Sequence, residues 1–96
     1  MKVLAILDLA PGVQLETVRA QLEGEIKCSW GLYASGALRE VYATAIATRV
    51  VFVLESENQS AAEKNLRLLP LVAAGLFKIE LIELRPFVNW SRLFAQ

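Results

Sequence analysis

The spacing of hydrophobic residues along the chain changes several times, and each change marks a new element of secondary structure. Residues 2–9 are almost continuously aliphatic and are followed by Ala10-Pro11-Gly12, a combination typical of turns, so we predict a first strand here. Between Gln14 and about Ser35 the apolar residues recur every three or four positions, which predicts one long helix. Gly36 then supplies a left-handed stop. The apolar face of this helix should carry Leu15, Val18, Leu22, Ile26, Trp30 and Tyr33.

The second half of the chain passes through the same kinds of element. Two β-type runs, residues 37–45 and 48–55, are separated by a short connection and should form an antiparallel hairpin. A second helix follows, capped either by Asn58 or by Ser60. Because Pro70 cannot continue a helix, we expect this one to end just before it. Its apolar stripe should consist of Ala62, Leu66 and Leu69.

A final strand over residues 76–84 completes the order β-α-β-β-α-β. This order predicts a ferredoxin-like α+β fold, a four-stranded antiparallel sheet with both helices on one face, as one domain over residues 1–96. The plan leaves the other sheet face bare, yet the run VVFVL at residues 50–54 has no polar alternation and requires burial on both sides. The sheet of a second copy would cover that face, so we predict a homodimer or a larger homo-oligomer.

Residues 86–96 follow the last strand and form a C-terminal arm that is surplus to the core of one subunit. Asn89 could cap a short helical turn in this arm. Large apolar side chains left in water on such a turn would each forfeit about 1.5–3 kcal/mol of burial. We therefore expect the arm to cross to a neighbouring subunit and to cover the rim of its barrel or pocket. The interface residues would be Phe87, Trp90, Leu93 and Phe94.

Composition argues against several classes of function. Ten Lys and Arg residues balance ten Asp and Glu residues and are scattered along the chain, which argues against a nucleic-acid or anionic-lipid surface. No apolar run approaches the roughly 20 residues needed to span a membrane. The single cysteine, Cys28, cannot form an internal disulfide and is typical of a buried thiol in a cytoplasmic protein.

The chain contains no histidine, the commonest general base and the commonest metal ligand. The lone cysteine and the scattered carboxylates form no metal-binding spacing, and the five glycines match no phosphate-binding loop. We therefore expect neither a metal nor a nucleotide cofactor.

Two stretches carry a resemblance to a known family, LYASGALREVY at residues 32–42 and LPLVAAGLFKIELIELRP at residues 69–86. Together with the order of the elements, they resemble the muconolactone-isomerase-like family of dimeric α+β barrel proteins over most of the chain from about Gln14. The resemblance implies sheets packed face to face in a homo-oligomer and an isomerase-like enzyme without a cofactor. The family pattern carries histidines around the second strand, where this chain has none, and Arg39 is the polar strand position that matches well.

Alternation along the second predicted strand groups Arg39 with Val41, while Glu40 and Tyr42 face the opposite way. Only one of these sets can lie under the helices, so Arg39 and Tyr42 are both candidate ligand-binding residues. An arginine in a pocket would suit a carboxylate-bearing ligand through a bidentate contact. The alternative is a structural salt bridge from Arg39 to Glu55 or Glu40.

The long helix supplies three further candidates. Trp30 and Tyr33 lie on its apolar face, where they would either stack on a flat ligand or belong to the core. Glu25 could serve as the acid or base of a proton transfer if it is desolvated, and otherwise lies on a solvated helix face. We expect Arg49 and Arg92 to form ion pairs at a rim or an interface.

Two hypotheses about function stay open at this point. The first is a small-molecule-binding protein or a cofactor-free isomerase-like enzyme acting on a small organic acid. The second is a non-catalytic homo-oligomeric assembly or regulatory module whose pocket is filled by its own side chains. A cavity of a few hundred cubic ångströms that holds Arg39 or Tyr42 would favour the first hypothesis, and a filled core would favour the second.

Overall fold

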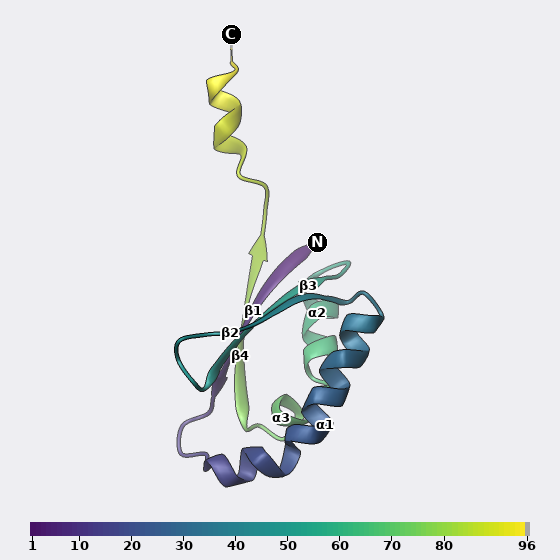
Figure 1. The fold of residues 1–96 in the computed structure, drawn as a ribbon. Helices are drawn as coiled ribbons and strands as arrows, with labels where there is room; N and C mark the ends of the chain where they lie inside the picture. The colour runs from purple at the N-terminus through teal and green to yellow at the C-terminus, as the bar shows by residue number, and fades with distance from the viewer. Residues whose placement is uncertain (96) are drawn as a thin grey trace.

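The structure is a computed structural model that describes residues 1–95 (Figure 1). Its strands and α-helices follow the predicted order, except that a short extra helix precedes the last strand and a 3-10 helix lies in the arm. In chain order the elements are β1 (Lys2–Leu9), α1 (Leu15–Ala34), β2 (Leu38–Ala43), β3 (Arg49–Glu55), α2 (Gln59–Leu66), α3 (Pro70–Ala73), β4 (Phe77–Leu84) and η1 (Val88–Leu93).

The four strands form one antiparallel sheet in the order β2-β3-β1-β4. Figure 1 shows the helices packed on one face of this sheet, which confirms the predicted ferredoxin-like α+β fold. Val3 pairs with Leu54 on one side and with Glu83 on the other, and these side chains point toward the helices. Their neighbours, such as Leu4, lie on the opposite sheet surface, which we call the open face.

The core fills the space between the helices and the sheet. Ala62 and Leu66 of α2 are buried as predicted, and Leu69, the third residue of the predicted stripe, is buried just before α3. The run VVFVL is buried at its centre, with Phe52 on the helix side and Val53 on the open face. The main core cluster contains Ala5, Leu7, Leu32, Leu38, Phe52, Leu54, Leu66, Leu69 and Val72.

Individual residues explain where the helices begin and end. Gly36 has φ +87°, the left-handed conformation predicted for the stop after α1. Asn58, not Ser60, caps α2, because its side-chain oxygen accepts a hydrogen bond of 2.8 Å from the Ala61 N–H. α2 ends at Leu66, earlier than predicted, so Pro70 does not itself end this helix. Pro70 is the first residue of α3, a position where the missing N–H of proline leaves no hydrogen bond unmade.

The orientation of α1 differs from the prediction. Its predicted apolar face is largely exposed, and the helix instead turns Cys28 and Leu32 toward the core, a rotation of about a quarter turn. In this orientation Gly24 lies next to α3, where a Cβ atom placed on it would be 3.5 Å from the Pro70 side chain, an ordinary van der Waals distance. The exposed stripe of α1 consists of Leu15, Leu22, Ile26, Trp30 and Tyr33.

The arm extends away from the rest of the chain beyond the end of β4 (Figure 1). It contains the predicted helical turn, but Asn89 does not cap it. Phe87 precedes the 3-10 helix, and Asn89 is its second residue. Phe87 and Trp90 contact each other edge to face with their ring centroids 5.5 Å apart, and both remain exposed. Within residues 1–95 no helix is long and apolar enough to cross a membrane.

Candidate functional site

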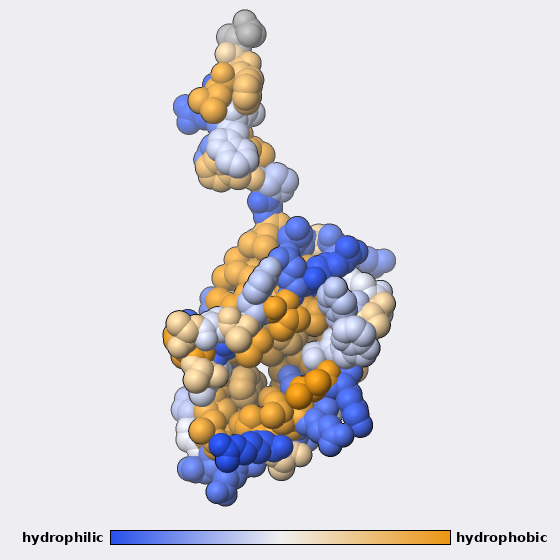
Figure 2. All heavy atoms as spheres, viewed as in Figure 1, coloured by the Kyte–Doolittle hydropathy of each residue, from blue (hydrophilic) through white to orange (hydrophobic). Residues whose placement is uncertain are grey.

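A cavity of about 310 Å³ lies between α1 and the helix side of the sheet. The sheet contributes Leu7, Val50 and Phe52, and α1 contributes Val18, Leu22 and Ile26. Only two of the lining residues, Glu25 and Ser29, are polar. Figure 2 shows hydrophobic side chains gathered around a hollow in the lower half of the molecule. The structure thus contains a small apolar cavity with a single carboxyl group in its wall.

The cavity follows from the way in which α1 packs. Gly24 lies against α3 and Leu32 lies in the core, while Leu22 and Ile26 of the exposed stripe lie along the cavity and are not buried against the sheet. The first half of α1 therefore leaves the sheet incompletely covered. The edge strand β2 and the β2–β3 turn close the side of the cavity with Val41 and Ala47.

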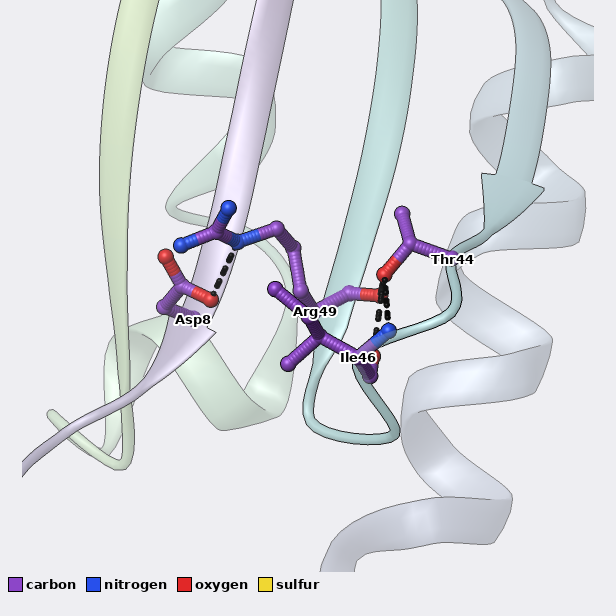
Figure 3. A network of polar contacts seen from close by, with 4 residues as sticks. All are labelled: Asp8, Thr44, Ile46 and Arg49. Atoms are coloured by element: carbon purple, nitrogen blue, oxygen red, sulfur yellow. Dashed lines mark hydrogen bonds and ion pairs between the residues drawn. The ribbon is translucent and has the colours of Figure 1, made fainter.

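The β2–β3 turn is held by a network of polar contacts (Figure 3). The Thr44 hydroxyl oxygen lies 2.9 Å from the Ile46 carbonyl oxygen and 3.0 Å from that of Arg49, and it accepts a bond from the Ile46 N–H. Arg49 also forms an ion pair with Asp8 at 2.9 Å, which confirms that Arg49 is ion-paired, as predicted. These contacts fix the turn that carries Ala47 to the cavity.

Glu25 is the predicted candidate that the structure places in the cavity. One of its carboxylate oxygens accepts a hydrogen bond of 3.0 Å from the Leu71 N–H, at the start of α3. Burial raises the pKa of the Glu25 carboxyl, and the bond from Leu71 opposes this rise. Glu25 therefore has two roles. It anchors α3 to α1, and it presents a partly desolvated carboxyl to the cavity.

Ser29 lies one helical turn after Glu25 and also lines the cavity, although nothing but this spacing marks it in the sequence. Its hydroxyl donates to the Ile26 carbonyl oxygen at 2.9 Å. Cys28, on the neighbouring face, donates its thiol hydrogen to the Leu68 carbonyl oxygen at 3.4 Å. Burial, and secondarily the charge of Glu25, raises the pKa of the Cys28 thiol, so this residue is poorly suited to act as a nucleophile.

Arg39 and Tyr42 do not line the cavity. A β-bulge between Leu38 and Glu40 breaks the expected alternation, and the exposed Arg39 donates from Nε to the Gly36 carbonyl oxygen at 2.7 Å. Tyr42 lies opposite Val51 on the open face and donates to Glu40 at 2.6 Å. That hydrogen bond, together with the charge of Glu40, raises the pKa of the Tyr42 hydroxyl.

Trp30 and Tyr33 lie outside both the cavity and the core. Their rings stack on each other with centroids 5.6 Å apart, and they are 67% and 51% exposed. The expectation that they belong to the core of the subunit is therefore wrong. The reason is the rotation of α1, which places them at the end of its exposed stripe.

A larger depression of about 440 Å³ lies where the arm leaves β4 and is lined by Met1, Lys2, Glu55, Leu84, Arg85 and Pro86. Its charged groups largely pair with each other or with neighbours. The N-terminal amine lies 2.9 Å from Glu55, and Arg85 lies 2.6 Å from Glu83. The cavity under α1 is the better candidate site, since its walls are apolar and its carboxyl lacks a cationic partner. In residues 1–95 no three potential metal-ligating side chains gather at one place.

Two enzymes of known structure share this fold. One is muconolactone isomerase, which matches with a TM-score of 0.74 and 18% identity over 93% of each chain. The other is 5-chloro-2-hydroxyhydroquinone dehydrochlorinase (TftG) from Burkholderia phenoliruptrix AC1100, in complex with 2,5-dihydroxybenzoquinone. It matches with a TM-score of 0.73 and 18% identity over 88% of this chain and 94% of that chain.

At this identity the likeness shows the fold alone, and the chain therefore has a muconolactone-isomerase-like α+β fold. No protein-family model matches the chain, and no curated protein sequence matches it either.

Proposed function

We propose that the protein binds a small organic molecule in the cavity under α1 and acts on it as an isomerase-like enzyme without a metal or nucleotide cofactor. The observation that carries this proposal is the partly desolvated carboxyl of Glu25 in an otherwise apolar cavity. The names of the two enzymes with the same fold, an isomerase and a dehydrochlorinase, agree with chemistry on small molecules. We also propose a cytoplasmic location, in keeping with the unpaired Cys28.

In this proposal Glu25 moves a proton within the bound molecule. Its carboxylate takes a proton from a carbon atom next to a carbonyl group and returns it to another carbon of the same molecule, so that a double bond shifts and the composition stays the same. A carboxyl with a raised pKa is a stronger base than an exposed one. The Leu71 N–H holds one carboxylate oxygen in place, which leaves the other for the ligand.

The other expected ligand-binding residues, Arg39, Tyr42, Trp30 and Tyr33, are exposed and lie outside the cavity. Tyr42, Trp30 and Tyr33 would contact a ligand only if a neighbouring copy placed them over the mouth of its cavity, and this part of the proposal depends on assembly. Arg39, whose Nε donates to the Gly36 carbonyl oxygen, has no role in ligand binding in this proposal.

Proton transfer can be tested by deuterium exchange. The protein is incubated in D₂O with α-angelica lactone, a β,γ-unsaturated lactone, and NMR spectroscopy follows both deuterium incorporation and the shift of the double bond. We expect wild-type protein to accelerate both, and Glu25→Gln to abolish the acceleration while remaining folded. Glu23→Gln is the matched control, since Glu23 lies on the same helix and pairs with Lys27 in solvent. Equal rates for wild type and Glu25→Gln would refute the catalytic role of Glu25.

A second candidate function is a homo-oligomeric assembly or regulatory module. The observation in its favour is the amount of apolar surface that one subunit leaves exposed on the stripe of α1 and on the arm. In such a module a neighbouring chain would fill the cavity. A stable oligomer that shows no thermal shift with any small molecule, and binds better once its arm is removed, would support this second function over the first.

A further inference from the structure

The wall of the cavity contains one ionisable group, and that group is acidic. Apart from Glu25 and Ser29 the lining is apolar, and none of the lining residues is a lysine or an arginine. Arg49, at the start of the strand that supplies Val50, lies on the open face and is bound to Asp8. Arg39 is held at the β-bulge by the Gly36 carbonyl oxygen. A bound anion would therefore meet a carboxyl and no cation.

From this distribution of charge we infer that the cavity takes an uncharged ring-sized molecule that carries a hydroxyl or carbonyl oxygen, and that it discriminates against carboxylates. The inference rests on the proposed small-molecule function and names the ligand class of that site. It replaces the expectation of an organic acid, which depended on Arg39 lying in the pocket.

Desolvation explains the discrimination. A carboxylate moved from water into an apolar cavity loses its hydration, and here it would gain no compensating charge. The nearby Glu25 adds like-charge repulsion whenever it is ionised. A neutral ligand avoids both costs and can form a hydrogen bond in either state of Glu25, because a ligand hydroxyl donates to the carboxylate and a ligand carbonyl accepts from the protonated acid.

The size of the cavity limits the ligand further. A volume of about 310 Å³ lies at the lower end of the range in which ligand sites are found, roughly 300–1,000 Å³. The walls are formed by aliphatic side chains and by Phe52 and Phe77, which favour a flat apolar body. The only polar groups, Glu25 and Ser29, lie one turn apart on the same helix and can contact one edge of a ring.

Probes of equal size and different charge test the inference. We would measure the affinities of phenol, methyl benzoate and benzoate at neutral pH by ligand-observed NMR spectroscopy, with wild-type protein and three variants. Glu25→Gln removes the negative charge of the cavity, and Ala47→Phe fills the cavity from the β2–β3 turn. Arg39→Met removes the arginine predicted from the sequence as the binding partner of a carboxylate. Circular dichroism confirms that each variant is folded.

We expect methyl benzoate to bind wild-type protein about tenfold or more tightly than benzoate, because like charges at short range repel more strongly in a partly desolvated site than in water. Glu25→Gln should reduce this difference in affinity by improving the binding of benzoate. Ala47→Phe should abolish the binding of all three probes. Arg39→Met should leave all three affinities unchanged. Benzoate bound as tightly as its ester, with binding lost in Arg39→Met, would overturn the inference and leave the small-molecule function intact. Failure of every probe to bind, or binding that Ala47→Phe does not affect, would overturn both.

Discussion

At the scale of single residues, Glu25 shows how a structural role and a chemical role can share one side chain. Its carboxylate accepts the Leu71 N–H and so ties α3 to α1, and the same group lies in the wall of the cavity. Burial of this group disfavours its charged form. The stability of the protein should therefore depend on the protonation of Glu25.

The direction of that dependence follows from the raised pKa. Between the ordinary value of 4.5 and the higher pKa of the folded state, the folded protein retains a proton that the unfolded chain has released. The contribution of Glu25 to the free energy of unfolding therefore falls as the pH rises through this window, and the loss is complete above the folded pKa. Glu25→Gln should lack this fall, so the stability of the variant relative to wild type should increase with pH. Urea denaturation of both proteins between pH 4 and pH 8 measures the difference, and parallel curves would contradict it.

The residue scale also shows where sequence reasoning reaches its limit. The desolvated Glu25 was predicted as one of two alternatives, because its place on the long helix is visible in the sequence. The position of Arg39 was not predictable, because a single β-bulge changes the face of every residue on one side of it. No residue type marks that bulge in the sequence.

At the scale of elements, the predicted strands and helices agree with the structure, since long apolar patterns and turn residues determine them locally. The orientation of α1 was missed for a different reason. Periodicity identifies the most apolar face of a helix, whereas in the structure α1 turns Cys28 and Leu32 toward the core and places Gly24 next to Pro70 of α3. Tertiary packing thus determines which face of α1 is buried, and the apolar stripe of the helix remains exposed in one subunit.

The cap of α2 gives a direct test at this scale. Asn58 accepts a hydrogen bond from the Ala61 N–H, so Asn58→Ala should lower the free energy of unfolding by about 1 kcal/mol. Ser60→Ala is the matched control and should have a much smaller effect, because Ser60 lies inside the helix and does not cap it. Urea denaturation measures both variants. A larger loss for Ser60→Ala would show that the start of the helix is assigned to the wrong residue.

At the scale of the whole molecule, the open face of one subunit exposes apolar side chains such as Ile82 and Leu84. We predict a homodimer through this face, burying about 800 Å² or more on each partner and stable at micromolar concentration. Val51 lies on the open face opposite Ile6, so Val51→Lys should produce a folded monomer. Leu68→Lys, an exposed position in the loop before α3, should remain a dimer. Light scattering distinguishes the two, and a monomeric wild type would end this proposal.

The arm leads to a separate prediction. Its aromatic side chains extend into solvent, and each would gain about 1.5–3 kcal/mol from burial against a neighbouring subunit. Deleting residues 87–96 should therefore lower the melting temperature and weaken assembly together. Trp90→Ala should reproduce much of this effect, whereas Asn89→Ala should not. A truncated chain with unchanged stability and unchanged mass in solution would show that the arm serves some other contact.

The exposed positions of the two tryptophans have a spectroscopic consequence. Trp30 lies on the stripe of α1 and Trp90 lies in the arm, and they are 67% and 69% exposed. In an isolated subunit both indoles are hydrated, so the intrinsic fluorescence should have the long emission wavelength of tryptophan in water. Dehydration of either indole on assembly shifts its emission to shorter wavelength. A variant that retains only one tryptophan therefore reports, without any added label, whether the stripe of α1 or the arm is buried in an interface.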